Sequence, residues 1–210
     1  CQNYQISHEG EGREVSALEL AQMMLTLERW GCHNINLVSP SHVIPQILSA
    51  LGIAAGRGLS LPLVYNTGGY DAVHALHLLN GIVDIHMPDM KYSDAEVGRR
   101  LSGIPDYPER NREAVREMHR QVGDLVIEAG LAKRGLLVRH LVLPHDLAGT
   151  REVVRFLVEE ISPNTYVNIM GQYRPCYRAW ELGELARPVS AKEYRHARDL
   201  ALRAGLRLAE

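Results

Sequence analysis

Short apolar runs rich in β-branched residues alternate with segments of helical periodicity along the whole sequence, and this alternation limits the fold more than any other feature. The runs of strand length are residues 34–39, 61–66, 82–87, 135–143 and 165–170. Alternating strands and helices are typical of a parallel sheet covered by helices. The sequence therefore predicts an α/β protein, built either as a (βα) barrel, whole or partial, or as an open doubly wound sheet.

The segments between these strands carry the start and stop signals of helices. Ser16 precedes apolar residues that are spaced for one helical face up to Leu27, and Gly31 follows them. Further helices are expected at residues 41–55, 71–79, 94–101, 108–128, 150–160 and 190–204, and a short last strand at residues 206–209. No repeat, low-complexity tract or linker interrupts the pattern, which indicates one domain.

The composition argues against several functional classes. Basic and acidic side chains nearly balance, at 23 and 25, and no cluster of Lys and Arg supplies the patch that nucleic acid or an anionic membrane requires. The apolar runs fall far short of the ~20 residues of a membrane span, and no signal-peptide pattern is present. Cys1, Cys32 and Cys176 are too few and too scattered for a disulfide framework. We therefore expect a soluble, cytoplasmic protein without nucleic-acid or membrane partners.

Polar residues follow each of the five predicted strands. In both candidate architectures, ligands bind just beyond the carboxyl ends of the strands. Turn formation and helix capping explain the same residue types equally well at each single position. The candidates, in chain order, are Ser39 and Ser41, Asn66 and Thr67, Asp89 and Lys91, His145 and Asp146, and Gln172 and Tyr173.

The pair Asp89 and Lys91 is the most informative of these candidates. Their i, i+2 spacing places both side chains on one side of an extended segment, where they could hold a zwitterionic or cation-bearing ligand. A weak surface ion pair is the alternative, and a Schiff-base lysine of an aldolase-like barrel is another. Gly68 and Gly69 permit close approach of the backbone to a ligand, but neither a dinucleotide fingerprint nor a phosphate loop is present, which disfavours NAD and ATP.

Histidines at three strand positions raise the possibility of catalytic zinc. His42, His86 and His140 lie on or directly after predicted strands, and three imidazoles are a known zinc ligand set. None of them has a partner at the spacing of a ligand motif. Because His86 and His140 lie inside strands, the sequence favours core histidines over metal ligands.

Five segments in one order along the chain carry a family resemblance: Cys-Gln-Asn-Tyr at 1–4, Tyr-Asn-Thr-Gly-Gly-Tyr at 65–70, Met-Pro-Asp-Met-Lys at 87–91, Val-Arg-His-Leu-Val-Leu-Pro at 138–144 and Asn-Ile-Met-Gly-Gln-Tyr at 168–173. Together they resemble the radical S-adenosylmethionine (SAM) proteins related to the pyruvate formate-lyase activating enzyme. The resemblance covers essentially the whole chain and implies a single radical SAM core domain over residues 1–210, with the fold of a partial (βα)6-type TIM-like barrel that lacks its first strand.

The resemblance implies two cofactors, a 4Fe-4S cluster and SAM. In this family a Cys-x3-Cys-x2-Cys motif binds the cluster, and reductive cleavage of SAM gives a 5′-deoxyadenosyl radical. Cys1 matches the third cysteine, whereas Cys32 and Cys176 fall at unrelated positions. We therefore expect an N-terminally truncated fragment that alone binds no intact cluster and is inactive. The implied partners are a glycyl-radical-type protein substrate and a reductant such as flavodoxin or ferredoxin.

Residue by residue, the resemblance implies a SAM site with a monovalent cation beside it. Asn66 and Thr67 occupy the place of an Asp-Thr pair at the cation site, and Met87 and Asp89 match its other members. Asn66 removes one charge from that site. Lys91 matches a lysine that contacts the methionyl carboxylate, in agreement with the ligand-binding role predicted from its spacing.

Further SAM contacts are implied on the other strands. Arg139 matches a strand arginine near the ligand, and Gln172 or Tyr173 falls where the activating enzymes place a histidine. Where many relatives have Gly-Gly-Glu to bind the methionyl amine, this chain has Val-Ser-Pro at 38–40, so that Ser39, Ser41 or a backbone carbonyl would serve.

Other functions remain open from the sequence alone. An unrelated βα-barrel lyase or hydrolase could use Lys91 or a histidine-bound zinc. An N-terminal nucleophile hydrolase could use Cys1, although the alternation of strands and helices disfavours its layered antiparallel core. A non-catalytic binding module is the remaining alternative.

Overall fold

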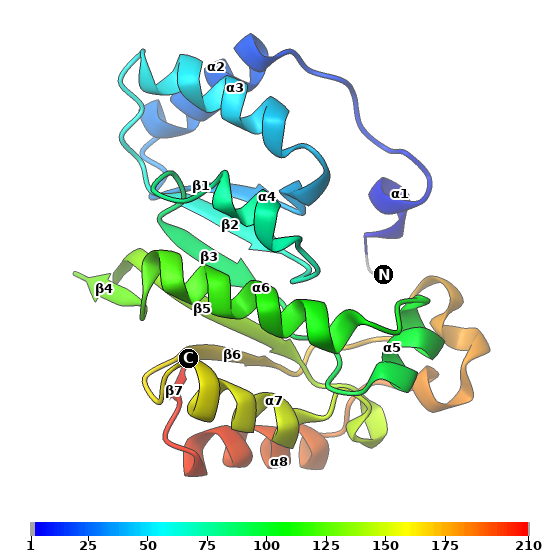
Figure 1. The fold of residues 1–210 in the computed structure, drawn as a ribbon. Coiled ribbons are helices and arrows are strands. Elements are labelled where there is room, and N and C mark those ends of the chain that lie inside the picture. The colour runs from blue at the N-terminus through cyan, green and yellow to red at the C-terminus, as the bar shows by residue number, and fades with distance from the viewer. Residues whose placement is uncertain (1–2, 210) are drawn as a thin grey trace.

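A parallel sheet forms the centre of the computed structural model, which describes residues 3–209 (Figure 1). Its strands lie in the order β1-β2-β3-β5-β6-β7, and all neighbours on this path are parallel. The strands are β1 (Ile35–Val38), β2 (Leu63–Thr67), β3 (Ile85–Pro88), β5 (Leu131–Leu141), β6 (Tyr166–Met170) and β7 (Arg207–Leu208). Because the spatial order follows the chain order without a reversal, the sheet is barrel-like rather than doubly wound.

Helices connect successive strands, and α2, α5 and α8 start at the predicted caps Ser16, Asp94 and Ser190, whereas α3 begins at Ile44, after the predicted cap Ser41. Ser16 and Ser190 each form a capping box with the glutamate three residues later. None of the described helices is long and apolar enough to cross a membrane. The helices are α1 (Tyr4–Ser7), α2 (Ala17–Arg29), α3 (Ile44–Ala55), α4 (Val73–His77), α5 (Ala95–Ser102), α6 (Tyr107–Val122), α7 (Thr150–Phe156) with a π-helical continuation (Leu157–Ile161), and α8 (Ala191–Arg203); short 3₁₀ turns are η1 (Pro40–His42), η2 (Pro144–Asp146), η4 (Tyr177–Glu181) and η5 (Gly183–Leu185).

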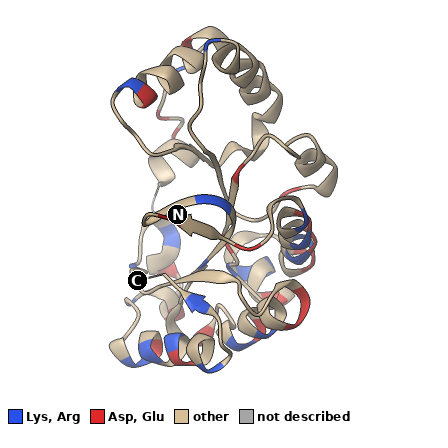
Figure 2. Cartoon of the chain, turned by 90° about the vertical axis from the view of Figure 1, so that its left-hand side faces the viewer, with Lys and Arg blue, Asp and Glu red and all other residues tan. Residues whose placement is uncertain are grey.

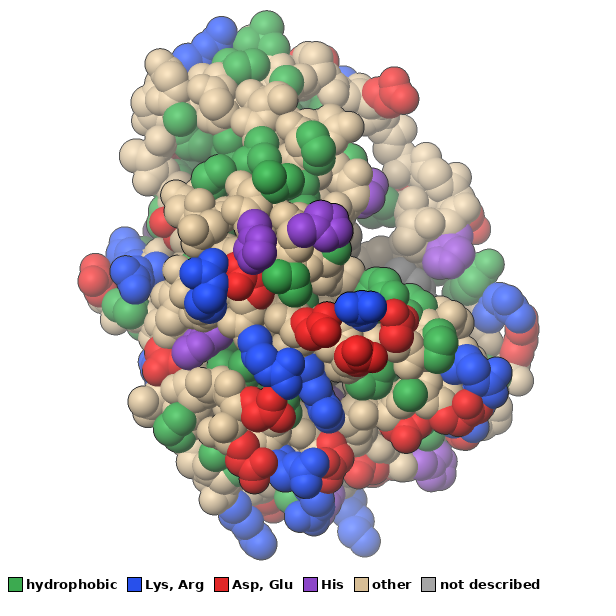
Figure 3. All heavy atoms as spheres, viewed as in Figure 1, with side chains coloured by type: hydrophobic (Ala, Val, Ile, Leu, Met, Phe, Trp, Pro, Cys, Tyr) green, Lys and Arg blue, Asp and Glu red, His purple; other side chains and the backbone are tan. Residues whose placement is uncertain are grey.

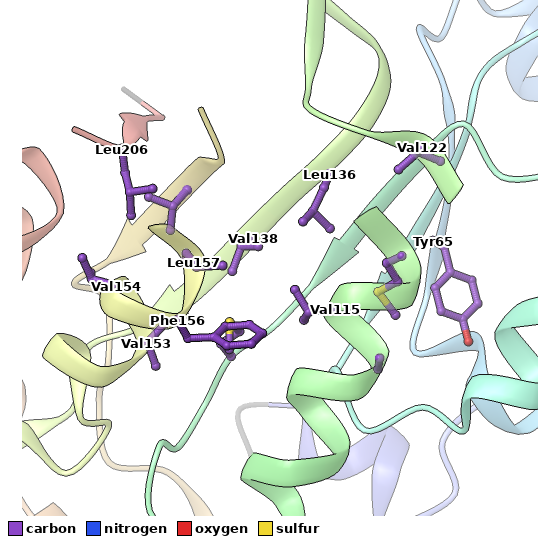
Figure 4. Packing of buried hydrophobic residues seen from close by; sticks show 14 of the residues in the cluster. Tyr65, Val115, Val122, Leu136, Val138, Val153, Val154, Phe156, Leu157 and Leu206 are labelled. Atoms are coloured by element: carbon purple, nitrogen blue, oxygen red, sulfur yellow. The ribbon is translucent and has the colours of Figure 1, made fainter. Parts of the chain in front are cut away.

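The main core lies between the sheet and the helices on one of its faces. Val138 of β5, Tyr65 of β2 and Val115 of α6 belong to this core, and Phe156 at the end of α7 and Leu157 in its π-helical continuation close it (Figure 4). Each of these side chains is buried. Burying a large aliphatic or aromatic side chain contributes about 1.5–3 kcal/mol, so this face fixes the positions of the strands.

The other face of the sheet is the inner face of the partial barrel and is only partly covered. It carries the small buried cluster Val64, Ile85 and Leu125. At its β1 end, Asn36 is exposed and Val38 has 62% of its surface accessible. The predicted fold, an α/β partial TIM-like barrel of parallel strands, is confirmed.

The outer surface of α6 is solvated and charged. Arg110 pairs with Glu113 at i, i+3 spacing and with Asp106 at i, i+4 spacing. On the face drawn in Figure 3, Lys and Arg are interspersed with Asp and Glu around this helix. The same mixing is visible along the ribbon from the side (Figure 2).

The predicted helix at residues 108–128 is wrong at its carboxyl end. The helix α6 ends at Val122, because Gly123 has a positive φ of 71°. Residues Val126–Glu128 form β4, which pairs antiparallel with the beginning of β5. Ala129 and Gly130 make the turn between them, both with positive φ. The strand β5 therefore begins at Leu131, four residues before the predicted start.

Candidate functional site

The carboxyl ends of the parallel strands meet at one edge of the sheet, on the side of α5 in Figure 1. Asp89 and Lys91 directly follow β3, and Arg139 lies within β5 beside them. Asn66 and Thr67 end β2, whereas Ser39 follows β1 in a left-handed conformation with φ of 52°. Gln172 and Tyr173 follow β6 at the same edge. The strands β1, β2, β3, β5 and β6 thus all contribute polar side chains to it.

An ion cluster joins three of the predicted site residues. Asp89 Oδ2 lies 2.5 Å from Lys91 Nζ, and Asp89 Oδ1 lies 2.6 Å from Arg139 Nη2. The exposed fractions of the side chains are 14% for Asp89, 25% for Arg139 and 40% for Lys91. Asp89 and Lys91 contact each other directly, so the ion pair that the sequence offered as an alternative is present, and their ligand-binding role stays a prediction. Because two cations share one carboxylate, the cluster keeps one net positive charge.

Arg139 also carries an unsatisfied donor. Its Nε is buried and has no hydrogen-bond partner among the described residues. A buried N–H without a partner costs about 1–3 kcal/mol. Asp89 Oδ1 is likewise buried without a hydrogen bond, although it lies 2.6 Å from Arg139 Nη2, so the inner end of the ion cluster holds one donor and one acceptor that no described residue satisfies.

The amino-terminal half of α6 holds the ends of β2 and β3 together. The Tyr107 hydroxyl donates to the carbonyl of Gly68 at 2.9 Å and accepts from the amide of Lys91 at 3.1 Å. Asn111 Nδ2 donates to the carbonyl oxygens of Gly69 and Asp89, each at 2.9 Å. Burial raises the pKa of Tyr107 well above its usual value, so the hydroxyl keeps its proton.

The contact between α6 and the ends of β2 and β3 explains why residue 69 is a glycine. Gly69 has φ of 76°, and a Cβ there would lie 2.2 Å from Asn111 Nδ2 and from the carbonyl oxygen of Asp89. Gly69 is therefore required by the approach of α6 rather than by a ligand. Gly68 differs, since a Cβ there would meet only Lys91 Cε, at 3.9 Å.

A second cluster lies at the ends of β1 and β2 and centres on the buried carboxylate of Asp71. Ser41 Oγ donates to Asp71 Oδ1 at 2.5 Å, and the Tyr65 hydroxyl donates to the same oxygen at 2.8 Å. Thr67 Oγ1 donates to Asp71 Oδ2 at 2.6 Å. Burial, and then the charge of Asp71, raise the pKa of Tyr65 far above its usual value. We call these four residues the Asp71 cluster.

The sequence assigned Asp71 to the start of a helix, and this assignment is wrong. The helix α4 begins at Val73 with Ala72 as its N-cap, because the Asp71 side chain turns into the sheet. Helix capping is a local pattern, whereas Ser41 is 30 residues away in the chain. Only the pairing of β1 with β2 brings these two residues together.

Gln172 and Tyr173, which follow β6, make their contacts outside both clusters. Gln172 is exposed and its Nε2 contacts Met170 Sδ at 3.3 Å. The Tyr173 hydroxyl donates to the carbonyl of Leu185 at 2.8 Å, and burial raises its pKa. Asn66 is buried and lies in register with Met87. Among the described residues, no hydrogen bond or ion pair links these three side chains to Lys91 or Arg139.

Two of the histidines considered for zinc are core residues. Both ring nitrogens of His140 have partners, the carbonyl of Met90 at 2.8 Å and Thr150 Oγ1 at 3.0 Å. His86 is buried on the helix-covered face, with Nε2 at 3.1 Å from Gln121 Oε1. Burial lowers the pKa of both histidines. His42 lies exposed on η1.

The described residues hold no ligand set for a metal ion or cluster. Residues 3–209 contain no group of three or more His, Cys, Asp or Glu side chains placed to hold a metal ion. Cys32 and Cys176 are free and half-buried. The predicted cluster ligand, Cys1, lies outside the described residues.

The architecture places the chain in a fold class shared with known proteins. No family model matches the sequence. The chain is 30% identical over 168 residues to a Methanocaldococcus jannaschii protein described as uncharacterized, a match that covers 80% of this chain and 46% of that protein. The fold resembles that of a radical SAM methyltransferase from Sphaerobacter thermophilus, with a TM-score of 0.63 and 16% identity over 94% of this chain and 57% of that one. The chain thus spans about half the length of these two proteins.

Proposed function

We propose that this chain is the SAM-binding part of a radical SAM enzyme. Three independent findings support the proposal. The five sequence segments resemble that family, the fold matches a structure of a radical SAM methyltransferase, and a cationic cluster lies at the edge of the sheet where this fold binds ligands.

The ion cluster is the single observation that carries the proposal. Lys91 and Arg139 leave a net positive charge beside Asp89, and the buried Nε of Arg139 lacks an acceptor. A carboxylate meets both conditions, since it accepts charge-assisted hydrogen bonds from ammonium and guanidinium groups. In the proposed complex, Lys91 and Arg139 bind the methionyl carboxylate, and Asp89 orients both cations.

A 4Fe-4S cluster does not fit the described residues. When present in such an enzyme, the cluster supplies the electron that cleaves SAM. Thiolates hold such a cluster, and Cys32 and Cys176 lie at positions unrelated to the cluster motif, outside any metal-binding group. For this chain the proposal is therefore restricted to the binding and orientation of SAM.

We further propose that the enzyme is of the activating class. The sequence segments support an activating enzyme that generates a glycyl radical on a partner protein, with flavodoxin or ferredoxin as reductant. The structural neighbour is a methyltransferase, but at 16% identity it contributes the fold alone. SAM binding at Lys91 is common to both possibilities, so it can be tested before the partner is known.

The alternative chemistry at Lys91 is disfavoured by the geometry. A Schiff-base lysine must lose its proton to act as a nucleophile. Asp89 lies 2.5 Å from the ammonium nitrogen and holds Lys91 in an ion pair. A ligand-binding role agrees better with this contact.

The test is a calorimetric titration of the chain with SAM. Lys91→Met keeps much of the side-chain volume and removes the charge. We expect this variant to weaken SAM binding by about 10-fold or more, which corresponds to about 1.4 kcal/mol. The matched control is Lys133→Met, which removes an exposed charge near the start of β5 and should leave the affinity unchanged. Equal affinities of wild type and Lys91→Met, or no binding by the wild type, would contradict the proposal.

A further inference from the structure

His140 is a completely buried polar side chain near the end of β5, next to the ion cluster. Its neighbour in the chain is Arg139, whose guanidinium pairs with Asp89. Consecutive residues of a strand point to opposite faces of the sheet. Arg139 therefore faces the ion cluster, whereas His140 lies on the helix-covered face with Val138. Buried polar groups are stable only when they are hydrogen-bonded, so the partners of His140 indicate what it does.

The two partners of His140 fix the position of its ring proton. Nδ1 lies 2.8 Å from the carbonyl oxygen of Met90, and Nε2 lies 3.0 Å from Thr150 Oγ1. Because a carbonyl can only accept, Nδ1 carries the proton. Burial lowers the pKa of His140, so the ring is neutral and its Nε2 accepts from the Thr150 hydroxyl. Thr150 is itself buried and begins α7, so the ring is held in one orientation.

The Met90 carbonyl belongs to the peptide group that joins Met90 to Lys91. The strand β3 ends before this peptide, at Pro88, so the regular hydrogen bonds of the ladder do not hold it. Its carbonyl accepts from His140, and its amide, which is that of Lys91, donates to the Tyr107 hydroxyl at 3.1 Å. His140 from the sheet and Tyr107 from α6 therefore fix the backbone from which the Lys91 side chain starts.

The direction of this peptide matters because lysine carries its charge on a flexible four-carbon stem. Lys91 Nζ lies 2.5 Å from Asp89, and Arg139 binds the other oxygen of the same carboxylate. A rotation of the backbone at Lys91 would move the ammonium group away from Asp89. The strand β5 thus supplies Arg139 to the ion cluster directly and controls Lys91 through the next residue, His140.

We propose that His140 is a positioning residue for ligand binding, which orients Lys91 toward the carboxylate of bound SAM by donating to the Met90 carbonyl. This role rests on the proposed binding of SAM by Lys91. The hydrogen bonds of His140 go to Met90 and Thr150, so His140 acts through Lys91 rather than on the ligand.

Two amide substitutions separate the roles of the two ring nitrogens. The side-chain nitrogen of Asn takes the place of Nδ1, whereas that of Gln takes the place of Nε2. His140→Asn should therefore keep the donor to Met90 and bind SAM within about twofold of wild type. His140→Gln loses this donor and should bind SAM about 10-fold more weakly, the cost of one unsatisfied buried acceptor. Both variants lose core packing, so a purely structural residue would give similar losses in the two.

A second measurement asks whether His140 acts through Lys91. Decarboxylated SAM, in which hydrogen replaces the methionyl carboxylate, offers Lys91 no carboxylate to bind. His140→Gln should leave the affinity for this ligand within about twofold of wild type. In a Lys91→Met background, His140→Gln should also change SAM binding by less than about twofold, because residues that act through one contact are not additive.

The matched control is His86→Gln. His86 is another buried histidine of the sheet, and its Nε2 contacts Gln121 instead of the backbone at the site. This variant should leave the SAM affinity unchanged.

Each outcome decides between the two claims. If wild type does not bind SAM, or if Lys91→Met binds it equally well, the proposed function fails. Suppose instead that Lys91→Met weakens binding. The positioning role is then overturned if His140→Gln does not weaken SAM binding, if His140→Asn weakens it as much, or if His140→Gln also weakens binding of decarboxylated SAM.

NMR spectroscopy of the labelled ring nitrogens tests the role in wild type, and so applies even if His140→Gln does not fold. A donor to Met90 requires the proton on Nδ1 of His140. A proton on Nε2 alone would overturn the proposed role.

Discussion

The buried histidine of β3 makes the stability of this protein depend on pH. His86 is completely buried beside Tyr65, and burial lowers its pKa from the ordinary value of 6.5 to about 4. The folded protein therefore keeps this ring neutral at a pH where the unfolded chain takes up a proton. Its Nδ1 has no partner among the described residues, so no hydrogen bond at that nitrogen compensates the charged form.

We predict a loss of stability between about pH 6.5 and pH 4. In this window the unfolded state binds more protons than the folded state, so the free energy of unfolding falls as the pH falls. The full difference for His86 is about 3 kcal/mol. His86→Gln, which retains a donor for Gln121, should reduce this slope in urea titrations at several pH values. The exposed His196→Gln should leave the slope unchanged, and equal slopes for wild type and His86→Gln would refute the prediction.

Local spacing predicted one cluster of the candidate site and missed the other. The pair Asp89 and Lys91 is two residues apart on an extended segment, so their common side followed from strand geometry. The members of the Asp71 cluster come from three segments, and their contacts depend on how β1 and β2 pair. Asp71 alone matched a helix cap, because capping and burial use the same residue type.

At the scale of single elements, α6 positions the candidate site. It contacts β3 and β5 through its buried face, and Tyr107 and Asn111 bind the backbone where β2 and β3 end. Such contacts require a backbone that comes very close to the helix. Gly69 provides that approach, and its neighbour Asp89 belongs to the ion cluster.

Two glycine substitutions separate the effect of this packing from that of backbone conformation. Gly69 and Gly81 have the same φ of 76°, but a Cβ on Gly81 meets nothing within 4 Å. Gly81→Ala should lower the free energy of unfolding by about 1 kcal/mol, the cost of a positive φ. Gly69→Ala should lower it by about 3 kcal/mol or more, since the helix must also move. Chemical denaturation measures both, and similar losses for the two variants would contradict a close approach at Gly69.

The elements themselves were largely predictable because their signals are local. Serines at the starts of α2 and α8 and β-branched runs in the strands marked most boundaries. The main error fell at the end of α6, where the polar periodicity of the helix concealed the hairpin of β4 and β5. Gly123 and Gly130, both with positive φ, are the signals that mark the two turns.

At the scale of the whole molecule, the sheet separates a packed face from an accessible one. The helices α6 and α7 cover one face, while the inner face remains partly exposed, as at Val38 (Figure 1). The strand order follows the chain order, so every βα connection places its loop at the same edge. This topology explains why residues from distant segments of the chain form the ion cluster and the Asp71 cluster at the same edge of the sheet.

The most direct test of the central claim is hydrogen exchange of the backbone amides, measured by mass spectrometry with and without SAM. The account predicts slower exchange at the carboxyl edge of the sheet, in residues 39–42, 67–71 and 89–91, and unchanged exchange in the β4–β5 turn at the opposite edge. Protection confined to that opposite edge, or exchange that SAM does not alter at any position, would contradict SAM binding at the carboxyl ends of the strands.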